Sequence, residues 1–424
     1  MKPFIDRVCA IPAYGWFAFI AALASSFGQT FFIGLFGGQL QATLALSPAG
    51  LGYLYGTATL LSGILMFWLG ALADRLALRR GIGISLGVLV LGCMAMASAH
   101  HALMLWGAFF LVRLGGQGLT GHLAIVAAAR YAIAQRGRTV AMASYGFILA
   151  EAIFPLLVAA ALVGRDWRLL WWLAAGLVAV VAWPVLRGLA LKFADLDLVH
   201  DQARRQNKVD FGPAPSAELT RWTLLRQPAF YLTLPMVLGS AFVITALFLH
   251  QGSLAAIKGW GLVDVGRAFV LFAVAQACAA FIAGRVIDAF GSLGVLRFFL
   301  WPMVASVVVL GWSAGPFDVW GVFLGLGLTA GANGVVSGAV WAELFGVRQL
   351  GMIRGVYTAF MVMASAIAPM LLGAWLSAGG TLAPLAGLAI VYGVALPQVL
   401  VGAIQRNKDA ARSGSTDNSG STDS

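Results

Sequence analysis

Apolar runs of roughly 20 residues recur from end to end of this chain, and each could cross a hydrocarbon core of about 30 Å. A soluble domain carries charge on about a quarter of its residues. Here only 10% of the 424 residues are charged and 61% are hydrophobic. Because lipid offers the backbone no hydrogen-bond partners, apolar runs of this length form helices. The sequence therefore predicts an all-α membrane protein with many spans.

Twelve segments have the length and character of membrane helices. We place them at residues 14–38, 50–72, 81–99, 102–127, 139–163, 169–190, 228–252, 264–287, 294–314, 318–342, 353–377 and 382–404. The longest polar interruption divides them into two sets of six. The expected domains are an N-terminal six-helix bundle (1–190), a cytoplasmic central loop (191–227), a C-terminal six-helix bundle (228–405) and a disordered cytoplasmic tail (406–424).

Lys and Arg are distributed unevenly between the two sides of these spans. With a cytoplasmic N-terminus, 22 of them lie inside and four outside, namely Arg165, Arg168, Lys258 and Arg267. The positive-inside rule then predicts that both termini are cytoplasmic. The net charge of +11 is a topology signal on this interpretation, and we expect no nucleic-acid partner. The three cysteines lie far apart and predict neither a disulfide framework nor a metal site.

The two halves of the chain repeat each other. Three pairs of residues share an offset of 214 positions: Gly70 and Gly284, Asp74 and Asp288, and Pro155 and Pro369. Glu151 falls opposite Ser365 at the same offset, so the acid belongs to the N-terminal half alone. Six-span halves related in parallel are an architecture of transporters, in which the substrate site lies between the halves near the middle of the membrane.

The segment GALADRLALRR, which begins at Gly70, resembles the loop 2–3 signature of the major facilitator superfamily. The resemblance extends over about residues 12–405 and implies two pseudo-symmetric six-helix bundles. In that family the signature Asp latches the cytoplasmic side against the start of the eleventh span, and Asp74 would do so near Arg354. The resemblance implies that the latch comprises Gly70, Asp74, Arg75, Arg79, Arg80, Gly284 and Asp288. Ala77 and Leu78 depart from the common pattern of the signature. Arg79 and Arg80 have an alternative interpretation, as positive charges that set the membrane topology and have no role in a latch.

The segment RLGGQGLTGH, Arg113 to His122, resembles the fourth-span motif of the same family. Together with SFGQTFFIGLFG (26–37) and TALFLHQ (245–251), it is similar to bacterial members near the monocarboxylate and oxalate/formate porters. This resemblance implies a multi-pass protein of the bacterial inner membrane. The eighth span lacks the Asp-Arg pair of animal monocarboxylate porters, so monocarboxylate transport does not carry over directly.

Two opposite charges are predicted near mid-membrane on consecutive spans. Arg113 lies about 16 Å from the outer surface and Glu151 about 18 Å from the inner one, at 1.5 Å per helical residue. A charge at this depth is costly, which makes both residues functional candidates. Our hypothesis is that they face a shared polar cavity and alternately pair and separate. The other candidates for substrate binding or proton coupling are Gln117, Gln29, His122, His250, Gln276 and Asn333.

Some of these residues have a second interpretation. A packing role suits His122 as well as proton transfer does. His250 lies at the predicted outer end of the seventh span and is a gate or a substrate contact. Glu343 lies near the cytoplasmic end of the tenth span, where a structural ion pair is the favoured interpretation.

These features together predict a secondary transporter that works by alternating access. The planar fork of Arg113 suits a carboxylate, and Glu151 suits a proton carrier, so we expect proton-coupled transport (symport) of a small organic anion. The alternative is a proton-driven exporter of drug-like or cationic molecules that uses Glu151 directly. A receptor that binds a solute without moving it is a third class. We find no nucleophile–base constellation or phosphate-binding loop, and we expect no enzyme activity, no cofactor and a functional monomer in the bilayer.

Overall fold

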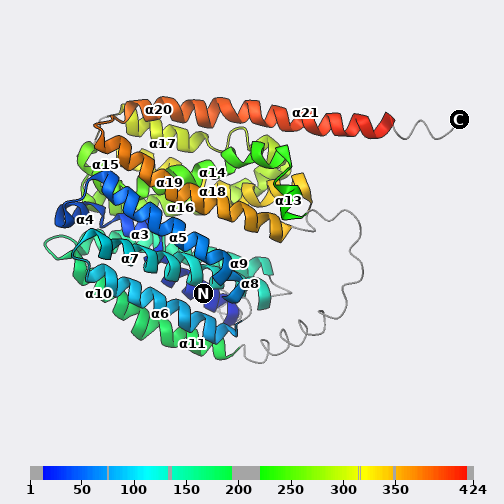
Figure 1. The fold of residues 1–424 in the computed structure, drawn as a ribbon. Helices are drawn as coiled ribbons and strands as arrows, with labels where there is room; N and C mark the ends of the chain where they lie inside the picture. Colours follow the sequence, from blue (N-terminus) through cyan, green and yellow to red (C-terminus); the bar gives the residue numbers. More distant parts are fainter. Residues whose placement is uncertain are drawn as a thin grey trace, which may run out of the picture. The chain divides into compact units, whose positions relative to one another are not determined.

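The computed structural model describes residues 13–73, 76–131, 136–192, 220–313, 315, 317–346 and 350–417. All regular secondary structure within these ranges is helical (Figure 1). Eleven helical stretches there are long and apolar enough to cross a membrane, and a further apolar helix is shorter. The predicted all-α membrane fold is confirmed, with one helical element for each predicted span.

The first six spans are interrupted at several points. They consist of α2 (Ala13–Ser25), η1 (Ser26–Gly28) and α3 (Thr30–Gly34), followed by α4 (Gly37–Leu44); α5 (Pro48–Ala73); α6 (Leu78–Ala97); α7 (Ala102–Val112), the π-helical η2 (Arg113–Thr120) and α8 (Gly121–Tyr131); α9 (Arg136–Ala161); and α10 (Trp167–Leu177), the π-helical η3 (Val178–Ala182) and α11 (Trp183–Leu191).

The second six spans follow a short helix, α13 (Arg221–Leu224). They consist of α14 (Pro228–Leu249), followed by α15 (Gln251–Lys258); α16 (Leu262–Val295); α17 (Trp301–Trp312); α18 (Asp318–Phe345); α19 (Leu350–Ser377); and α20 (Ala383–Ile390), the π-helical η4 (Val391–Ala395) and α21 (Leu396–Asp417). The helix predicted at 294–314 is the short α17, because residues 296–300 form turns and Pro302 lies in its first turn.

The repeat seen in the sequence extends to local helix geometry. Pro155 lies inside α9 and Pro369 inside α19, where each removes one backbone donor from its helix. The sixth and twelfth spans are both interrupted by a five-residue π-helical segment, η3 and η4. A proline follows shortly after each, Pro184 in α11 and Pro397 in α21.

The chain divides into two compact units. The first contains residues 1–215, 245–270 and 365–379, and the second contains 216–244, 271–364 and 380–424. The first unit therefore includes one end of α14, of α16 and of α19. The predicted tail, 406–424, begins within α21, and most of the predicted central loop lies outside the described residues.

In the first unit α2 packs against α8 and α9. In the same unit α6 packs against α7, α10 and α11 (Figure 1). Glycines bring backbones together at the α2–α9 contact and where η1 meets the end of α7. A Cβ on Gly146 of α9 would lie 2.3 Å from the carbonyl oxygen of Phe19 in α2. One on Gly28 would lie 2.1 Å from the carbonyl oxygen of Val112. Small residues of this kind let membrane helices approach closely.

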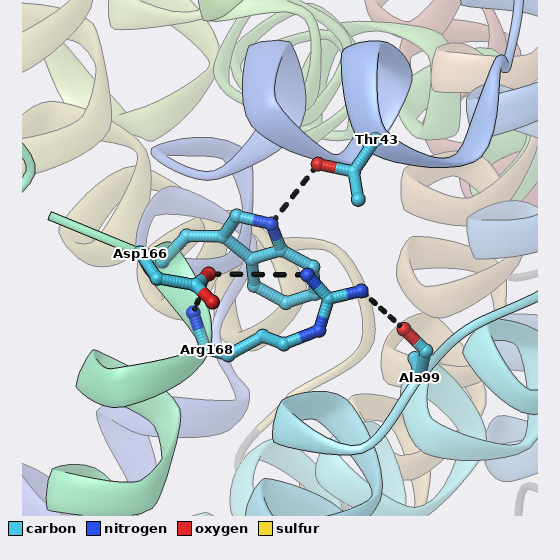
Figure 2. A network of polar contacts seen from close by, with 5 residues as sticks. Thr43, Ala99, Asp166 and Arg168 are labelled. Atoms are coloured by element: carbon cyan, nitrogen blue, oxygen red, sulfur yellow. Dashed lines mark hydrogen bonds and ion pairs between the residues drawn. The ribbon is translucent and has the colours of Figure 1, made fainter.

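A polar network joins the start of α10 to α4 and to the segment after α6, at the predicted outer side of the first unit (Figure 2). The Trp167 indole donates to the Thr43 hydroxyl at 3.2 Å, and the Arg168 guanidinium donates to the Ala99 carbonyl at 3.0 Å. Asp166 caps α10 by accepting from the Arg168 amide. Its ion pair with the Arg168 guanidinium is 3.9 Å long and the Asp166 side chain is 61% exposed, so this pair contributes little to stability.

In the second unit α17 packs against α18 and α20. A Cβ on Gly325 would lie 2.2 Å from the carbonyl oxygen of Pro302, and one on Gly311 would lie 2.8 Å from that of Leu382. The Ser306 hydroxyl donates to the Val322 carbonyl at 2.8 Å across the α17–α18 contact. In both units, glycines at helix crossings therefore allow close packing of the backbones.

The close approach at Gly28 makes a stability prediction. We expect Gly28→Ala to lower the free energy of unfolding by about 1–3 kcal/mol, because its Cβ would meet backbone that no side-chain rotation can move. The matched control is Gly107→Ala in α7, where a Cβ meets nothing within 4 Å and helix propensity favours Ala. Thermal unfolding in detergent should show a lower melting temperature for the first variant only. Equal melting temperatures would contradict the packing described here.

Candidate functional site

The first span is broken where the site begins. After η1, Gln29 has an extended backbone (φ −83°, ψ 152°), and the short helix α3 starts only at Thr30. The break takes Gly28 and its neighbours out of the regular ladder of helical hydrogen bonds. Broken membrane helices are tolerated where other groups satisfy the freed backbone. The Gly28 carbonyl is one such freed acceptor.

The fourth span changes from α- to π-helix at Arg113. This segment, RLGGQGLT, contains three glycines, and the Thr120 hydroxyl donates to the Gly115 carbonyl within it at 2.6 Å. A Cβ on Gly116 would lie 2.7 Å from the Cα of Gly28, so the π-helix lies directly against the break in the first span. Single π-helical turns occur often at functional sites. Here the segment carries the Arg113 side chain.

The Arg113 guanidinium is buried, with 1% of the residue exposed. Its Nη1 donates to the Gly28 carbonyl at 3.0 Å and contacts the Thr30 hydroxyl at 3.5 Å, and its Nε donates to the Thr59 hydroxyl at 3.2 Å. The Tyr55 ring lies 5.2 Å from the guanidinium carbon, and the Tyr55 hydroxyl bonds to Thr30 at 2.6 Å. Two elements of the first span and one turn of α5 therefore surround the charge.

All of these partners of Arg113 are uncharged. Its remaining nitrogen, Nη2, is buried and has no hydrogen-bond partner among the described residues. Arg113 thus bonds to hydroxyls and a carbonyl in this structure rather than to Glu151. The alternating Arg113–Glu151 pair stays a prediction. Thr30, Tyr55 and Thr59 were not among the predicted site residues. The sequence signal for two of them is the four-residue spacing that places Tyr55 and Thr59 on one helix face.

Glu151 lies half-buried in α9, four residues before the helix-interior Pro155. One turn along from it, Phe154 stacks on Phe27 with ring centroids 5.0 Å apart. Phe27 belongs to η1, and both α9 and η2 contact this segment. The break in the first span therefore lies between the helix that carries Glu151 and the one that carries Arg113.

The other predicted polar residues fall into separate groups. Gln29 lies in the break of the first span, and Gln117 lies in the π-helical segment one turn after Arg113; both are half-buried. His122 is half-buried at the start of α8. Gln276 in α16 and Asn333 in α18 belong to the second unit.

In the second unit Asn333 takes part in a polar cluster with α19. The Tyr357 hydroxyl interacts with the side chains of Asn333 and Ser337 and lies 3.4 Å from the Val237 carbonyl. Tyr357 also packs beside the buried Trp341, with ring centroids 5.7 Å apart. The side chains of this cluster are uncharged, although the charge of Arg354 acts on Tyr357, whereas the cluster in the first unit is built around a cation.

His250 and Gln251 lie in a packed contact at the predicted outer side of the first unit. The His250 Nε2 is 2.8 Å from the Pro369 carbonyl oxygen, and the Gln251 amide donates to the Phe31 carbonyl at 3.1 Å. Nearby, the Gln41 amide donates to Ser253 at 3.0 Å and the Ala49 amide to Ser377 at 2.8 Å. We call this contact the outer seal; it joins α3, α4 and the start of α5 to the α14–α15 turn and the end of α19.

The predicted latch is described only in part. Asp74 and Arg75 lie outside the described residues, and Gly70 is described only in its helical backbone. Arg79 and Arg80 are exposed in the first turn of α6, and Asp288 is exposed near the end of α16. A Cβ on Gly284 would meet nothing within 4 Å. The latch remains a prediction.

Glu343, by contrast, makes hydrogen bonds that the structure describes. Its carboxylate accepts from the Ser292 amide at 3.0 Å and from the Ser292 hydroxyl. Ser292 follows Gly291, whose backbone (φ 72°, ψ 158°) breaks α16. A carboxylate at the start of the resumed helix is favourable there.

Comparison with known proteins identifies the family. A family model described as "Major Facilitator Superfamily" matches residues 18–269. This chain belongs to that superfamily. No curated protein matches it in sequence. The described residues hold no group of three or more His, Cys, Asp or Glu side chains suited to a metal ion.

Solved structures of transporters share the fold. The nucleoside transporter NupG aligns with a TM-score of 0.66 at 12% identity, over 91% of this chain and 98% of its own. The peptide transporter POT, solved with sulfate, aligns with 0.67 at 16% identity, over 93% and 95%. A bacterial homologue of the lysosomal transporter Spinster aligns with 0.62 at 16% identity, over 93% and 94%. At these identities the likeness shows the fold alone.

Family and fold together establish the general class. This superfamily member is a multi-pass membrane protein of the transporter class rather than an enzyme. These comparisons do not show the similarity to monocarboxylate and oxalate/formate porters. Two of the structural neighbours are named as nucleoside and peptide transporters, and the name of the third gives no substrate.

The Thr59 hydroxyl holds the Arg113 Nε in place. We expect Thr59→Val to lower the free energy of unfolding by about 1–3 kcal/mol, because it leaves a buried charged donor without its acceptor. Thr59→Ser keeps the hydroxyl and should lose only the contribution of one methyl group, about 0.8 kcal/mol. Melting temperatures of the two purified variants make the comparison. A Thr59→Val protein as stable as Thr59→Ser would contradict this role of Thr59.

Gly34 tests the outer seal. A Cβ there would lie 1.8 Å from the Phe248 carbonyl oxygen, so Gly34→Ala should keep the seal open. We would measure labelling of a Ser365→Cys reporter, which is 6% exposed, by an impermeant maleimide in a background without Cys9, Cys93 and Cys278. The expected result is labelling at least fivefold faster.

The control for this experiment is Gly38→Ala, where a Cβ meets nothing within 4 Å. It should leave the labelling rate unchanged. If Gly34→Ala labels no faster than Gly38→Ala, the α3–α14 contact does not close the path to Ser365.

Proposed function

We propose that this chain is a proton-coupled secondary transporter of a small organic anion, such as a carboxylate, and that it works by alternating access. The observation that carries the proposal is the buried guanidinium of Arg113, which has uncharged partners and one nitrogen left over. An anionic substrate would supply the missing countercharge.

The chemistry of Arg113 supports a carboxylate in particular. A guanidinium is charged at every physiological pH and donates in a fixed planar fork. Nε and Nη1 are engaged by Thr59 and Gly28, so the fork is held in one orientation and Nη2 carries the free N–H groups. A hydrogen bond between two charged groups is about twice as strong as a neutral one. Gln29 and Gln117, half-buried beside the same break, could add neutral donors.

Glu151 is the proposed proton carrier. A carboxyl group in a membrane interior takes up a proton more readily than one in water, because burial disfavours its charged form. The charge of Arg113 on the neighbouring span opposes that effect. When an anion binds Arg113, the net positive charge near Glu151 falls, and Glu151 becomes easier to protonate. Substrate binding and proton uptake are linked in this way, which gives symport of one anion with a proton.

The proposal includes a cell-membrane location with both termini in the cytoplasm. The charge bias supports this topology, since Lys and Arg gather on one side of the predicted spans. The proposal also takes the functional unit to be a monomer, as each chain would carry its own Arg113 and Glu151.

Replacing Arg113 tests the anion site. We expect Arg113→Gln to lose at least tenfold in affinity for anions, and Arg113→Lys to keep part of it because the charge remains but the fork does not. Binding would be measured as the thermal shift of purified protein with lactate, pyruvate, oxalate and succinate, followed by counterflow of the radiolabelled compound that shifts most. Arg168→Gln, which removes a guanidinium from the outer loops, is the matched control and should bind normally.

A companion variant separates the two candidate functions. In proteoliposomes, Glu151→Gln should bind the anion but abolish the proton flux that the anion induces. If Arg113→Gln leaves binding intact while Glu151→Gln abolishes binding of lipophilic cations, the chain is the proton-driven exporter instead. Unchanged proton flux in Glu151→Gln would exclude Glu151 as the carrier.

A further inference from the structure

The outer seal is closed by backbone contacts that leave no room for a side chain. A Cβ on Gly52 would lie 2.5 Å from the Pro369 carbonyl oxygen, and one on Gly373 would lie 2.4 Å from that of Pro48. With Gly34 against Phe248, there are three such main-chain contacts between segments far apart in the sequence: two join α5 to α19 and one joins α3 to α14. Because these backbones are in direct contact, a small displacement breaks the packing, and we treat the seal as having two states, closed and open.

His250 lies at the centre of these contacts. It is completely buried in the turn after α14, and its Cε1 is 3.0 Å from the position of a Cβ on Gly373. The Pro369 carbonyl, 2.8 Å from Nε2, is an acceptor, so Nε2 carries a proton and donates. The other ring nitrogen, Nδ1, is buried and has no hydrogen-bond partner among the described residues. This is the arrangement of a neutral imidazole.

The seal offers no countercharge for an imidazolium. Residues 26–73, 228–257 and 355–384, which include the parts of α3, α4, α5, α14, α15 and α19 that form the seal, contain no Asp, Glu, Lys, Arg or second His. At the start of α16, Asp264 and Arg267 are half or more exposed and pair with each other at 3.6 Å. Lys258 at the end of α15 would repel a second positive charge.

We propose that His250 is a pH-sensitive lock on the outer seal, neutral when the seal is closed and protonated when it opens to an acidic exterior. Protonation would give the ring a second N–H, at Nδ1, with no acceptor in the packed contact, and would bury a charge without a partner. Both effects favour the open seal, where water solvates the imidazolium. The proposal does not depend on which solute is carried or on the roles of Arg113 and Glu151.

The direction of the pH effect follows from the buried imidazole. Burial lowers the pKa of His250 below its ordinary value of 6.5, and the hydrogen bond to Pro369 opposes the shift in part. The closed seal therefore binds fewer protons than the open one. Its stability is fully present above pH 6.5 and is lost as the pH falls through that value.

The same Ser365→Cys reporter tests the lock. We would measure labelling by an impermeant maleimide at pH 7.5 and pH 5.5, each rate divided by that of an exposed Val163→Cys reporter to remove the pH dependence of the reagent. The ratio should rise at least threefold at pH 5.5 in the parent protein. It should not change with pH in His250→Gln, which keeps an amide donor for Pro369 but cannot titrate.

His100→Gln is the matched control, since His100 is exposed in the predicted outer loop after α6. It should keep the parent pH response. A parent ratio that stays flat or falls with acid, or a His250→Gln protein that still responds, would overturn the proposal. Folding of each variant is checked by its melting temperature at pH 7.5, so loss of structure is not mistaken for loss of the response.

Discussion

A positive charge buried in the membrane without a carboxylate beside it is the constraint on which the first unit depends. Arg113 is 1% exposed, and the structure meets its needs with a carbonyl and hydroxyls. The carbonyl is available only because the first span breaks at Gly28 and Gln29. The break can lie there only because Gly28 and Gly116 permit contact between backbones. The helix break, the π-helix and the glycine crossing thus act together to give a buried guanidinium its hydrogen-bond partners in the absence of water.

This solution leaves the charge uncompensated, which separates it from a structural ion pair. Removing one partner of a buried ion pair is strongly destabilising, so a protein that pairs its charge permanently cannot easily release it. Neutral acceptors hold a guanidinium in place while its charge remains available to a ligand. On the function proposed above, a site of this kind suits an anion that must bind and then leave.

The fold was predictable because the bilayer leaves few alternatives. Apolar runs gave one helix for each predicted span, and counting residues placed Arg113 deep in the fourth. The break in the first span was not predictable, because SFGQ contains no proline and a single glycine is common inside a membrane helix. Thr30, Tyr55 and Thr59 were missed for a related reason: a hydroxyl on a membrane helix ordinarily bonds to its own backbone, and only tertiary contacts show that these three surround a charge.

The two halves use their shared architecture differently. Proline at 155 and at 369 interrupts equivalent helices, yet the N-terminal copy has Glu151 four residues earlier and the C-terminal copy has Ser365. In α19 the Pro369 carbonyl is instead turned to a neighbour, His250, which closes the outer seal. The proline in the helix interior therefore has a different neighbour in each half. In the N-terminal half it lies near an acid, and in the C-terminal half its own carbonyl accepts a hydrogen bond from a histidine. If both groups bind protons during the cycle, one near mid-membrane and one at the outer seal, external acid would open the entrance and also load the carrier, so that a single proton gradient drives both steps in the same direction.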